Sequence, residues 1–244
     1  MSGPRLETDA VRERYARRPS AALDPRYQML NPAVWQAVHE RQRAMLRLLA
    51  GVAPQGLAHL TLLEVGCGSG GNLLELLRFG FDAGNLCGIE LLEERHAQAR
   101  RALPTALRLV CADASDVTVA PASVDIVMQS TVFSSLLDDA FQQRLADAMW
   151  RRVKPGGSVL WYDFTVNNPR NPDVRGVPLA RVRALFPQGR LQARRLTLAP
   201  PIARAVTRLH PVFYPVFNAV PALRTHVLIR IAKPAHGAHG AQGA

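Results

Sequence analysis

The residues best suited to chemistry lie in one glycine-rich stretch, residues 61–77 (TLLEVGCGSGGNLLELL). A short apolar run leads into four glycines, and leucines then recur at helical spacing, a pattern typical of a strand, a glycine turn and a helix. Glycines tolerate positive φ and have no side chain to hold a ligand away, while the start of a helix presents free N–H groups. The stretch therefore predicts a cofactor-binding turn.

Three acidic residues accompany this turn, and each belongs to a different predicted strand. Glu64 lies inside the strand before the glycines, Glu90 ends the next strand (residues 85–89), and Asp113 follows the third (residues 107–111). Glu90 is placed to accept hydrogen bonds from a ribose diol, and Asp113 to meet an adenine amino group. The three strands would therefore share one nucleoside-binding edge.

This combination of glycines and acidic residues resembles the class I S-adenosylmethionine-dependent methyltransferases, in particular bacterial enzymes of the small-molecule type. The resemblance continues through residues 124–132 (VDIVMQSTV) and 153–157 (VKPGG), covers residues 61–164, and has a compatible ending at 225–233. It implies an α/β, Rossmann-like fold with a seven-stranded, mostly parallel sheet, helices on both faces and an antiparallel last strand. It also implies S-adenosylmethionine as the cofactor.

The resemblance also suggests which residues contact the cofactor. Glu64 and the glycines would hold the methionine end, Glu90 the ribose, and Asp113 with Ala114 the adenine. The expected cofactor-binding residues are Glu64, Gly66, Cys67, Gly68, Gly70, Asn72, Glu90, Leu91, Asp113, Ala114, Gln129 and Ser130.

The glycines alone also fit an NAD(P)-dependent oxidoreductase, because residues 66–71 contain a formal G-x-G-x-x-G. Two observations count against this alternative. Glu64 stands where a nicotinamide-binding strand is normally apolar, and no Tyr-x-x-x-Lys pair follows the fourth predicted strand.

The rest of the chain is expected to surround this core. Residues 1–60 predict an N-terminal arm and a helix that cap the active site, and residues 61–234 the methyltransferase domain. Insertions at 165–178 and 200–222 would form the acceptor pocket, and the low-complexity residues 235–244 predict a disordered tail.

The segments expected to surround the methyl acceptor supply the predicted substrate contacts and the candidate bases. Aligning nucleophile, methyl group and sulfur is the main requirement of methyl transfer, so a base is optional, although a hydroxyl acceptor would benefit from one. The candidate bases are Asp163, His39 and His210. The predicted substrate contacts come from the arm, the end of the fourth strand and the segment after the fifth: Tyr15, Tyr27, Phe133, Asn167, Asn168, Arg170 and Arg175.

The charge of the chain is unevenly distributed. The net charge is +11, but residues 61–165 carry −4 and the flanks therefore +15. Basic flanks fit an anionic acceptor, an anionic membrane surface or nucleic acid, and equally a genomic bias toward arginine. The apolar, proline-interrupted residues 200–221 predict either an insertion packed on the core or an apolar wall of the acceptor pocket, with peripheral membrane contact as an open alternative.

Several missing patterns narrow the function. No D-x-x-D/N arrangement follows the fourth strand, so no metal is expected. Residues 129–133 read QSTVF rather than the N/D-P-P-Y/F motif of many nucleic-acid amino methyltransferases. The three cysteines are unpaired by spacing, and we expect neither a signal peptide nor a spanning helix, which predicts a reduced, cytoplasmic protein.

These observations predict an enzyme that methylates a small-molecule or glycan-type metabolite, most often at a hydroxyl oxygen, with an acceptor that is anionic and part apolar. An RNA or protein methyltransferase that uses the basic flanks is the main alternative. Against it, the sequence shows no basic run interleaved with stacking aromatic residues, so nucleic acid is not favoured.

Overall fold

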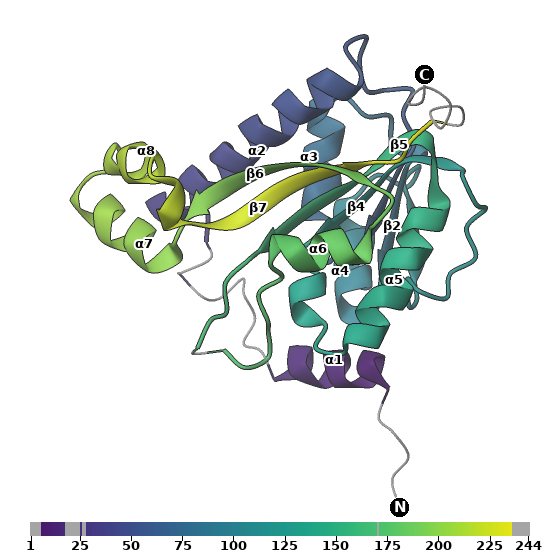
Figure 1. Cartoon of the computed structure of the whole chain (residues 1–244), viewed down its shortest axis with the longest axis horizontal. Coiled ribbons are helices and arrows are strands. Elements are labelled where there is room, and N and C mark those ends of the chain that lie inside the picture. The colour runs from purple at the N-terminus through teal and green to yellow at the C-terminus, as the bar shows by residue number, and fades with distance from the viewer. Residues whose placement is uncertain (1–5, 18–24, 26–27, 170, 236–244) are drawn as a thin grey trace, which may run out of the picture.

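The computed structural model describes residues 6–17, 25, 28–169 and 171–235, and a seven-stranded sheet forms its centre (Figure 1). The strand order is β3-β2-β1-β4-β5-β7-β6. The five strands from β3 to β5 are parallel, whereas β7 runs antiparallel to both β5 and β6. The strands are β1 Leu62–Val65, β2 Leu86–Glu90, β3 Arg108–Cys111, β4 Val124–Ser130, β5 Val153–Phe164, β6 Arg190–Leu198 and β7 Arg224–Ala232. The predicted Rossmann-like sheet with an antiparallel ending is confirmed.

Helices cover both faces of this sheet. One face packs against α2, α3 and α4, and the other against α5, α6 and two residues of α1, Val11 and Tyr15. The α-helices are α1 Glu7–Ala16, α2 Pro32–Val52, α3 Gly71–Phe79, α4 Glu93–Ala102, α5 Asp139–Arg152, α6 Leu179–Leu185, α7 Pro200–Leu209 and α8 Phe213–Asn218. Three short 3-10 helices complete the described part: η1 Ala83–Asn85, η2 Phe133–Ser135 and η3 Pro221–Leu223. A parallel sheet that is covered on both faces explains the almost continuous apolar runs of its strands.

Some element boundaries differ from the sequence expectation. The strand β2 is Leu86–Glu90 rather than 85–89, and β3 is Arg108–Cys111 rather than 107–111. The strand β5 already begins at Val153, because the backbone of the glycine-containing turn at 156–157 pairs with Lys233 at the end of the sheet. These differences leave the glycine turn between β1 and α3.

The apolar segment 200–221 forms two helices, α7 and α8, as its internal prolines suggest. They stand at one end of the molecule beside the start of α2 (Figure 1). Ala203, Val206 and Tyr214 form a small core there with Ala33 of α2 and Leu198 of β6. We call residues 200–223, which comprise α7, α8 and η3, the α7–α8 lobe. Within the residues that the structure describes, no helix has the length and apolar character needed to cross a bilayer.

Candidate active site

The glycine turn between β1 and α3 packs so closely against neighbouring residues that two of its glycines have no room for a side chain. Gly66 has a φ of +65°, and a Cβ atom added there would lie 2.5 Å from Cγ2 of Val132. Gly70 has a φ of +88° and a similar conflict with Leu103. The N–H of Cys67 donates to the carbonyl of Ile89 at 3.0 Å, which fixes the turn against β2. The turn therefore offers bare backbone at the carboxyl ends of β1 and β2.

Glu90 connects the end of β2 with this turn. Its Oε2 accepts a hydrogen bond from the N–H of Gly68 at 2.7 Å, and its Oε1 accepts one from the N–H of Leu92 at 2.9 Å. The side chain is buried. Because each carboxylate oxygen has a second lone pair, Glu90 is able to accept further hydrogen bonds from a pair of ligand hydroxyls.

Glu64 is the most unusual group of the site. It is fully buried in β1, and its Oε1 accepts a hydrogen bond from Nδ2 of Asn72 at 2.6 Å, while Oε2 has no hydrogen-bond partner in the described part of the chain. Burial raises the pKa of Glu64 to about 7, against the opposing effects of Asn72 and the charge of Arg41. A buried carboxylate oxygen without a partner is costly. The site is therefore suited to a ligand that brings a positively charged hydrogen-bond donor to Oε2.

Cys67 lies in the same turn, close to both of these carboxylates. Its side chain is buried, and burial raises the pKa of the thiol strongly, with further contributions from Glu64 and Glu90. The thiol is therefore kept in its protonated form.

Asp113 lies beyond the end of β3. Its Oδ1 accepts hydrogen bonds from the N–H and the hydroxyl of Ser115, at 2.8 and 2.9 Å. The neighbouring Ala112 donates its N–H to the carbonyl of Glu90 at 3.0 Å, so this loop lies against the end of β2. Ala114 is buried behind it. The structure thus brings Asp113 to the same sheet edge as Glu64 and Glu90.

The chain turns sharply after the end of β4, next to the glycine turn. Gln129 is fully buried, and its Oε1 accepts a hydrogen bond from the N–H of Val132 at 3.0 Å. Thr131 adopts a left-handed backbone with a φ of +56°. Phe133, which we expected to contact substrate, has no exposed surface and packs on Trp161 with ring centroids 4.5 Å apart. In the structure this ring supports the turn from inside the core.

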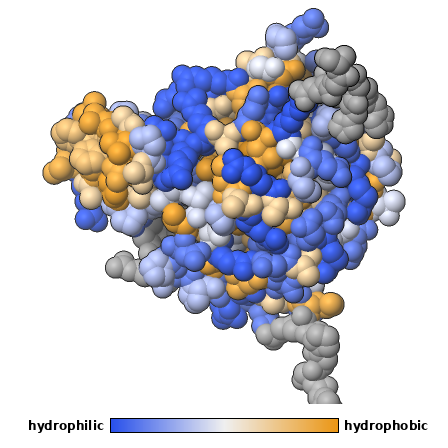
Figure 2. Space-filling model, in the orientation of Figure 1, coloured by the Kyte–Doolittle hydropathy of each residue, from blue (hydrophilic) through white to orange (hydrophobic). Residues whose placement is uncertain are grey.

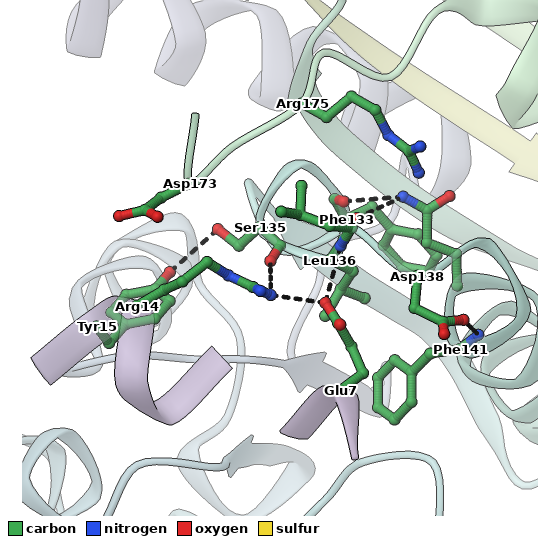
Figure 3. Close-up of polar contacts among 12 residues, drawn as sticks. Glu7, Arg14, Tyr15, Phe133, Ser135, Leu136, Asp138, Phe141, Asp173 and Arg175 are labelled. Carbon is green, nitrogen blue, oxygen red and sulfur yellow. Dashed lines mark hydrogen bonds and ion pairs between the residues drawn. The ribbon is translucent and has the colours of Figure 1, made fainter. Parts of the chain in front are cut away.

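The helix α1 of the N-terminal arm packs against η2 (Figure 3). Arg14 donates to the carbonyl of Ser135 at 2.9 Å and pairs with Glu7 at 2.6 Å, and Glu7 accepts the N–H of Leu137 at 2.8 Å. The hydroxyls of Tyr15 and Ser135 are 3.3 Å apart. These contacts hold α1 beside the carboxyl end of β4.

The ring of Tyr15 also reaches the glycine turn through Arg95 of α4. The guanidinium carbon of Arg95 lies 5.1 Å from the centre of that ring. The same guanidinium is 3.5 Å from the place where a Cβ of Gly68 would stand. The arm, α4 and the glycine turn therefore meet at Tyr15 and Arg95. Tyr27 lies outside the described residues.

The segment after β5 is held by its own polar groups. Asn167 accepts the N–H of Gly176 at 2.9 Å, and Arg175 pairs with Asp139 of α5. Arg17 at the end of α1 pairs with Asp173 at 3.0 Å, so the arm and this segment are in contact. Asn168 is exposed. Arg170 lies outside the described residues.

The three candidate bases do not come together. Asp163 is fully buried in β5, where its carboxylate accepts the N–H groups of Ser134 at 3.1 Å and Phe164 at 2.9 Å, and burial raises its pKa to about 7. His39 is exposed on α2 and packs on Trp35. His210 is exposed at the end of α7, where its Nδ1 accepts the N–H of Val212 at 3.2 Å.

Two residues near the carboxyl end of β5 escaped the sequence analysis. Arg41 of α2 pairs with Glu75 at 2.9 Å and lies 5.4 Å from the ring centre of Tyr162. His226 of β7 stacks on Tyr162 with centroids 5.2 Å apart, and it meets the ring of Phe164 edge-on at 5.8 Å. Burial lowers the pKa of His226 to about 4, assisted by the positive charge of Arg41, so the imidazole is neutral at pH 7.

Comparison with known proteins agrees with this geometry. A family model described as a methyltransferase domain matches residues 63–161. A comparison with curated proteins finds no match.

Three solved structures share the fold at low sequence identity. The geranyl diphosphate C-methyltransferase from Streptomyces coelicolor A3(2), solved with Mg²⁺, geranyl diphosphate and S-adenosylhomocysteine, has a TM-score of 0.60 and 16% identity, covering 95% of this chain and 98% of that one. The Burkholderia thailandensis 1,6-didemethyltoxoflavin-N1-methyltransferase, solved with 1,6-didemethyltoxoflavin and S-adenosylhomocysteine, has a TM-score of 0.60 and 13% identity, covering 96% and 93%. A SAM-dependent methyltransferase from Archaeoglobus fulgidus has a TM-score of 0.57 and 15% identity, covering 79% and 94%.

The matched domain begins inside β1 and ends inside β5, so it contains the glycine turn and the strand ends that carry Glu90 and Asp113. The match and the shared fold support the expected enzyme class and cofactor: residues 63–161 match a methyltransferase domain, and the fold is that of solved S-adenosylmethionine-dependent methyltransferases.

Proposed function

We propose that this chain transfers the methyl group of S-adenosylmethionine to a small-molecule or glycan-type metabolite, at a hydroxyl oxygen. The observation that carries the proposal is the buried Glu64 carboxylate, whose Oε2 lacks a partner among the described residues, beside a glycine turn in which Gly66 and Gly70 have no room for a side chain of their own. Two structurally similar enzymes, those solved with geranyl diphosphate and with 1,6-didemethyltoxoflavin, hold small molecules, which supports an acceptor of that class.

Within this proposal each part of the cofactor meets a group of matching chemistry. Glu64 Oε2 would accept the ammonium group, and Arg41, whose charge acts on Glu64, would bind the carboxylate. Glu90 would accept the ribose hydroxyls and the loop of Asp113 the adenine. When bound, the cofactor supplies a methyl group on a positively charged sulfur. The chain's own residues then have to hold the acceptor in line and exclude water.

The proposed binding site for the methyl acceptor is formed by the elements that meet at the carboxyl end of β5. Tyr15 of the arm, the segment 165–178 and the pair of Tyr162 and His226 surround this end. We propose that Asp163 acts chiefly by positioning, because its two oxygens hold the backbone N–H groups of Ser134 in η2 and of Phe164 at the end of β5. His226 is the histidine nearest to this end of β5, since it pairs with Phe164 in the sheet.

The experiment is label transfer from methyl-tritiated S-adenosylmethionine into a bacterial cell extract, followed by partition into organic, small aqueous and macromolecular fractions. The Glu90→Ala protein, with its fold checked by circular dichroism, is the control, because it loses the proposed ribose contact. Counts in the organic or small aqueous fraction that depend on Glu90 would support the proposal. Counts in RNA or protein would refute it in favour of a polymer substrate, for which the net charge of +15 on the flanks is the supporting observation.

A further inference from the structure

The α7–α8 lobe has two apolar faces. The inner face packs on α2 and β6 around Ala203, Val206 and Tyr214. The outer face is exposed, with Leu209 at 79% and Val216 at 60% of their full accessibility. Figure 2 shows apolar residues gathered on this lobe, which stands out from an otherwise mixed surface. The exposed apolar residues are Leu209, Val212, Phe213, Val216, Phe217 and Val220. A cluster of this kind marks an interaction site more often than chance exposure does.

The lobe is firmly attached, so its outer face is a fixed surface. Glu40 of α2 accepts hydrogen bonds from the hydroxyl of Tyr214 at 3.0 Å and from Nδ2 of Asn218 at 2.7 Å. It also accepts the N–H of Thr197 at the end of β6 at 3.1 Å. Gln36 donates to the carbonyl of Pro211 at 3.1 Å. One carboxylate thus ties α8 and β6 to the long helix α2.

The part of the chain that contains this lobe carries charge of a single sign. From Val174 to Ala244 the chain carries eleven arginine and lysine residues and no aspartate or glutamate. Arg204 and Arg208 lie on α7 itself, and Arg194 and Arg195 are exposed on the edge strand β6, which leads into the lobe. An apolar face with cations on its flanks matches a surface that is apolar inside and anionic at its boundary. A second copy of the chain would place cations against cations.

We propose that the α7–α8 lobe docks on anionic lipid membranes, with its outer apolar face in the headgroup region and its arginines on the lipid phosphates. The lobe follows β6 and precedes β7, whose His226 pairs with Phe164 at the carboxyl end of β5. Docking would therefore bring the carboxyl ends of the central strands, where the candidate active site lies, toward the membrane. The proposal concerns this surface and holds whatever the methyl acceptor is.

The test is co-sedimentation of the full chain with vesicles of phosphatidylglycerol and phosphatidylethanolamine, compared with vesicles of phosphatidylcholine alone. We expect binding to the anionic vesicles that falls as salt is raised, because exposed charges are screened. The double variant Leu209→Glu/Val216→Glu should bind at least about ten-fold more weakly, since it places acids in the apolar face. The matched control is Leu46→Glu on α2, which is 41% exposed outside the lobe and should bind as the wild type does.

A second variant tests the charge separately. Arg204→Gln/Arg208→Gln should weaken binding to anionic vesicles and reduce its dependence on salt. Circular dichroism and S-adenosylhomocysteine titration would show that each variant keeps its fold and its cofactor site. Equal sedimentation with both vesicle types, or no sedimentation with either, would overturn the proposal. So would a dimer in light scattering that the Leu209→Glu/Val216→Glu change abolishes, because the face would then join two copies of the chain.

Discussion

The buried carboxylate of Glu64 should make the stability of the ligand-free protein fall as pH rises. Its pKa is raised from 4.5 to about 7 by burial. Between these values the folded protein keeps a proton at Glu64 that the unfolded chain has lost, so the free energy of unfolding decreases with increasing pH. At about 1.4 kcal/mol per pKa unit, the full effect is about 3 kcal/mol.

The substitution Glu64→Gln isolates this effect. Glutamine keeps the shape and a hydrogen-bonding partner for Asn72 but does not titrate, and the contribution of Asp163, which is raised in the same direction, is common to both proteins. Urea unfolding of the two proteins from pH 4 to pH 8 should show the variant gaining about 3 kcal/mol relative to the wild type across this range. If the free energies of unfolding of the two proteins changed with pH in parallel, the reasoning would be refuted.

The same substitution should have the opposite effect on the cofactor. Calorimetry with S-adenosylhomocysteine should show binding weakened by about 1–3 kcal/mol at pH 8, because a charged hydrogen bond to the ammonium group is lost.

Asp125→Asn is the control of opposite sign for the stability measurement. Burial acts to raise the pKa of Asp125, but hydrogen bonds from Thr61 and Lys154 together lower it, so the stabilisation that its carboxylate gives is lost as pH falls. Because the ordinary pKa of Asp125 is 3.8, the Asp125→Asn protein should lose stability relative to the wild type as pH rises through the range below about 4, and the difference between the two proteins should stay constant from pH 5 to pH 8. If it gained stability instead, the gain of the Glu64→Gln protein would not be specific to the buried carboxylate of Glu64.

Three further substitutions test the architecture of the site. Glu90→Ala should weaken S-adenosylhomocysteine binding by about 1–3 kcal/mol, and unchanged affinity in calorimetry would contradict the ribose assignment. Gly66→Ala should lower the free energy of unfolding by about 1–3 kcal/mol in a urea titration, because the φ of Gly66 is +65° and Val132 occupies the place of the Cβ atom. The control is Gly51→Ala, which should be neutral or stabilising in the same titration, because no atom lies within 4 Å of the added Cβ. Glu40→Ala should cost about 1–3 kcal/mol and expose α8 to limited proteolysis, since it leaves buried donors without an acceptor; protection equal to the wild type would contradict its anchoring role.

The strands, the glycine turn and its acidic residues could be predicted because their signals are local. Apolar runs, glycines and the residue at a strand end are all recognised from a few neighbouring positions in the sequence. The split of residues 200–221 into two helices also follows from local prolines.

The acceptor side could not be predicted in the same way, because it depends on contacts between distant residues. His226 becomes relevant only through its pairing with Phe164 in the sheet. On α2, Arg41 rather than His39 contacts Tyr162, and this depends on which side of the helix faces the sheet. Phe133 lies just beyond the carboxyl end of β4, in η2, yet its ring packs inward on Trp161. Such choices are decided by tertiary packing.

The buried thiol of Cys67 has a consequence for the chemistry next to it. A methyl group on positively charged sulfur is open to attack by a thiolate that is aligned with it, and Cys67 stands in the turn for which we propose the donor's binding site. Burial and the two neighbouring carboxylates keep this sulfur protonated, and a protonated thiol is a poor nucleophile. In the proposed site, the acids that suit it to a cationic cofactor would thus also protect the enzyme from alkylating itself.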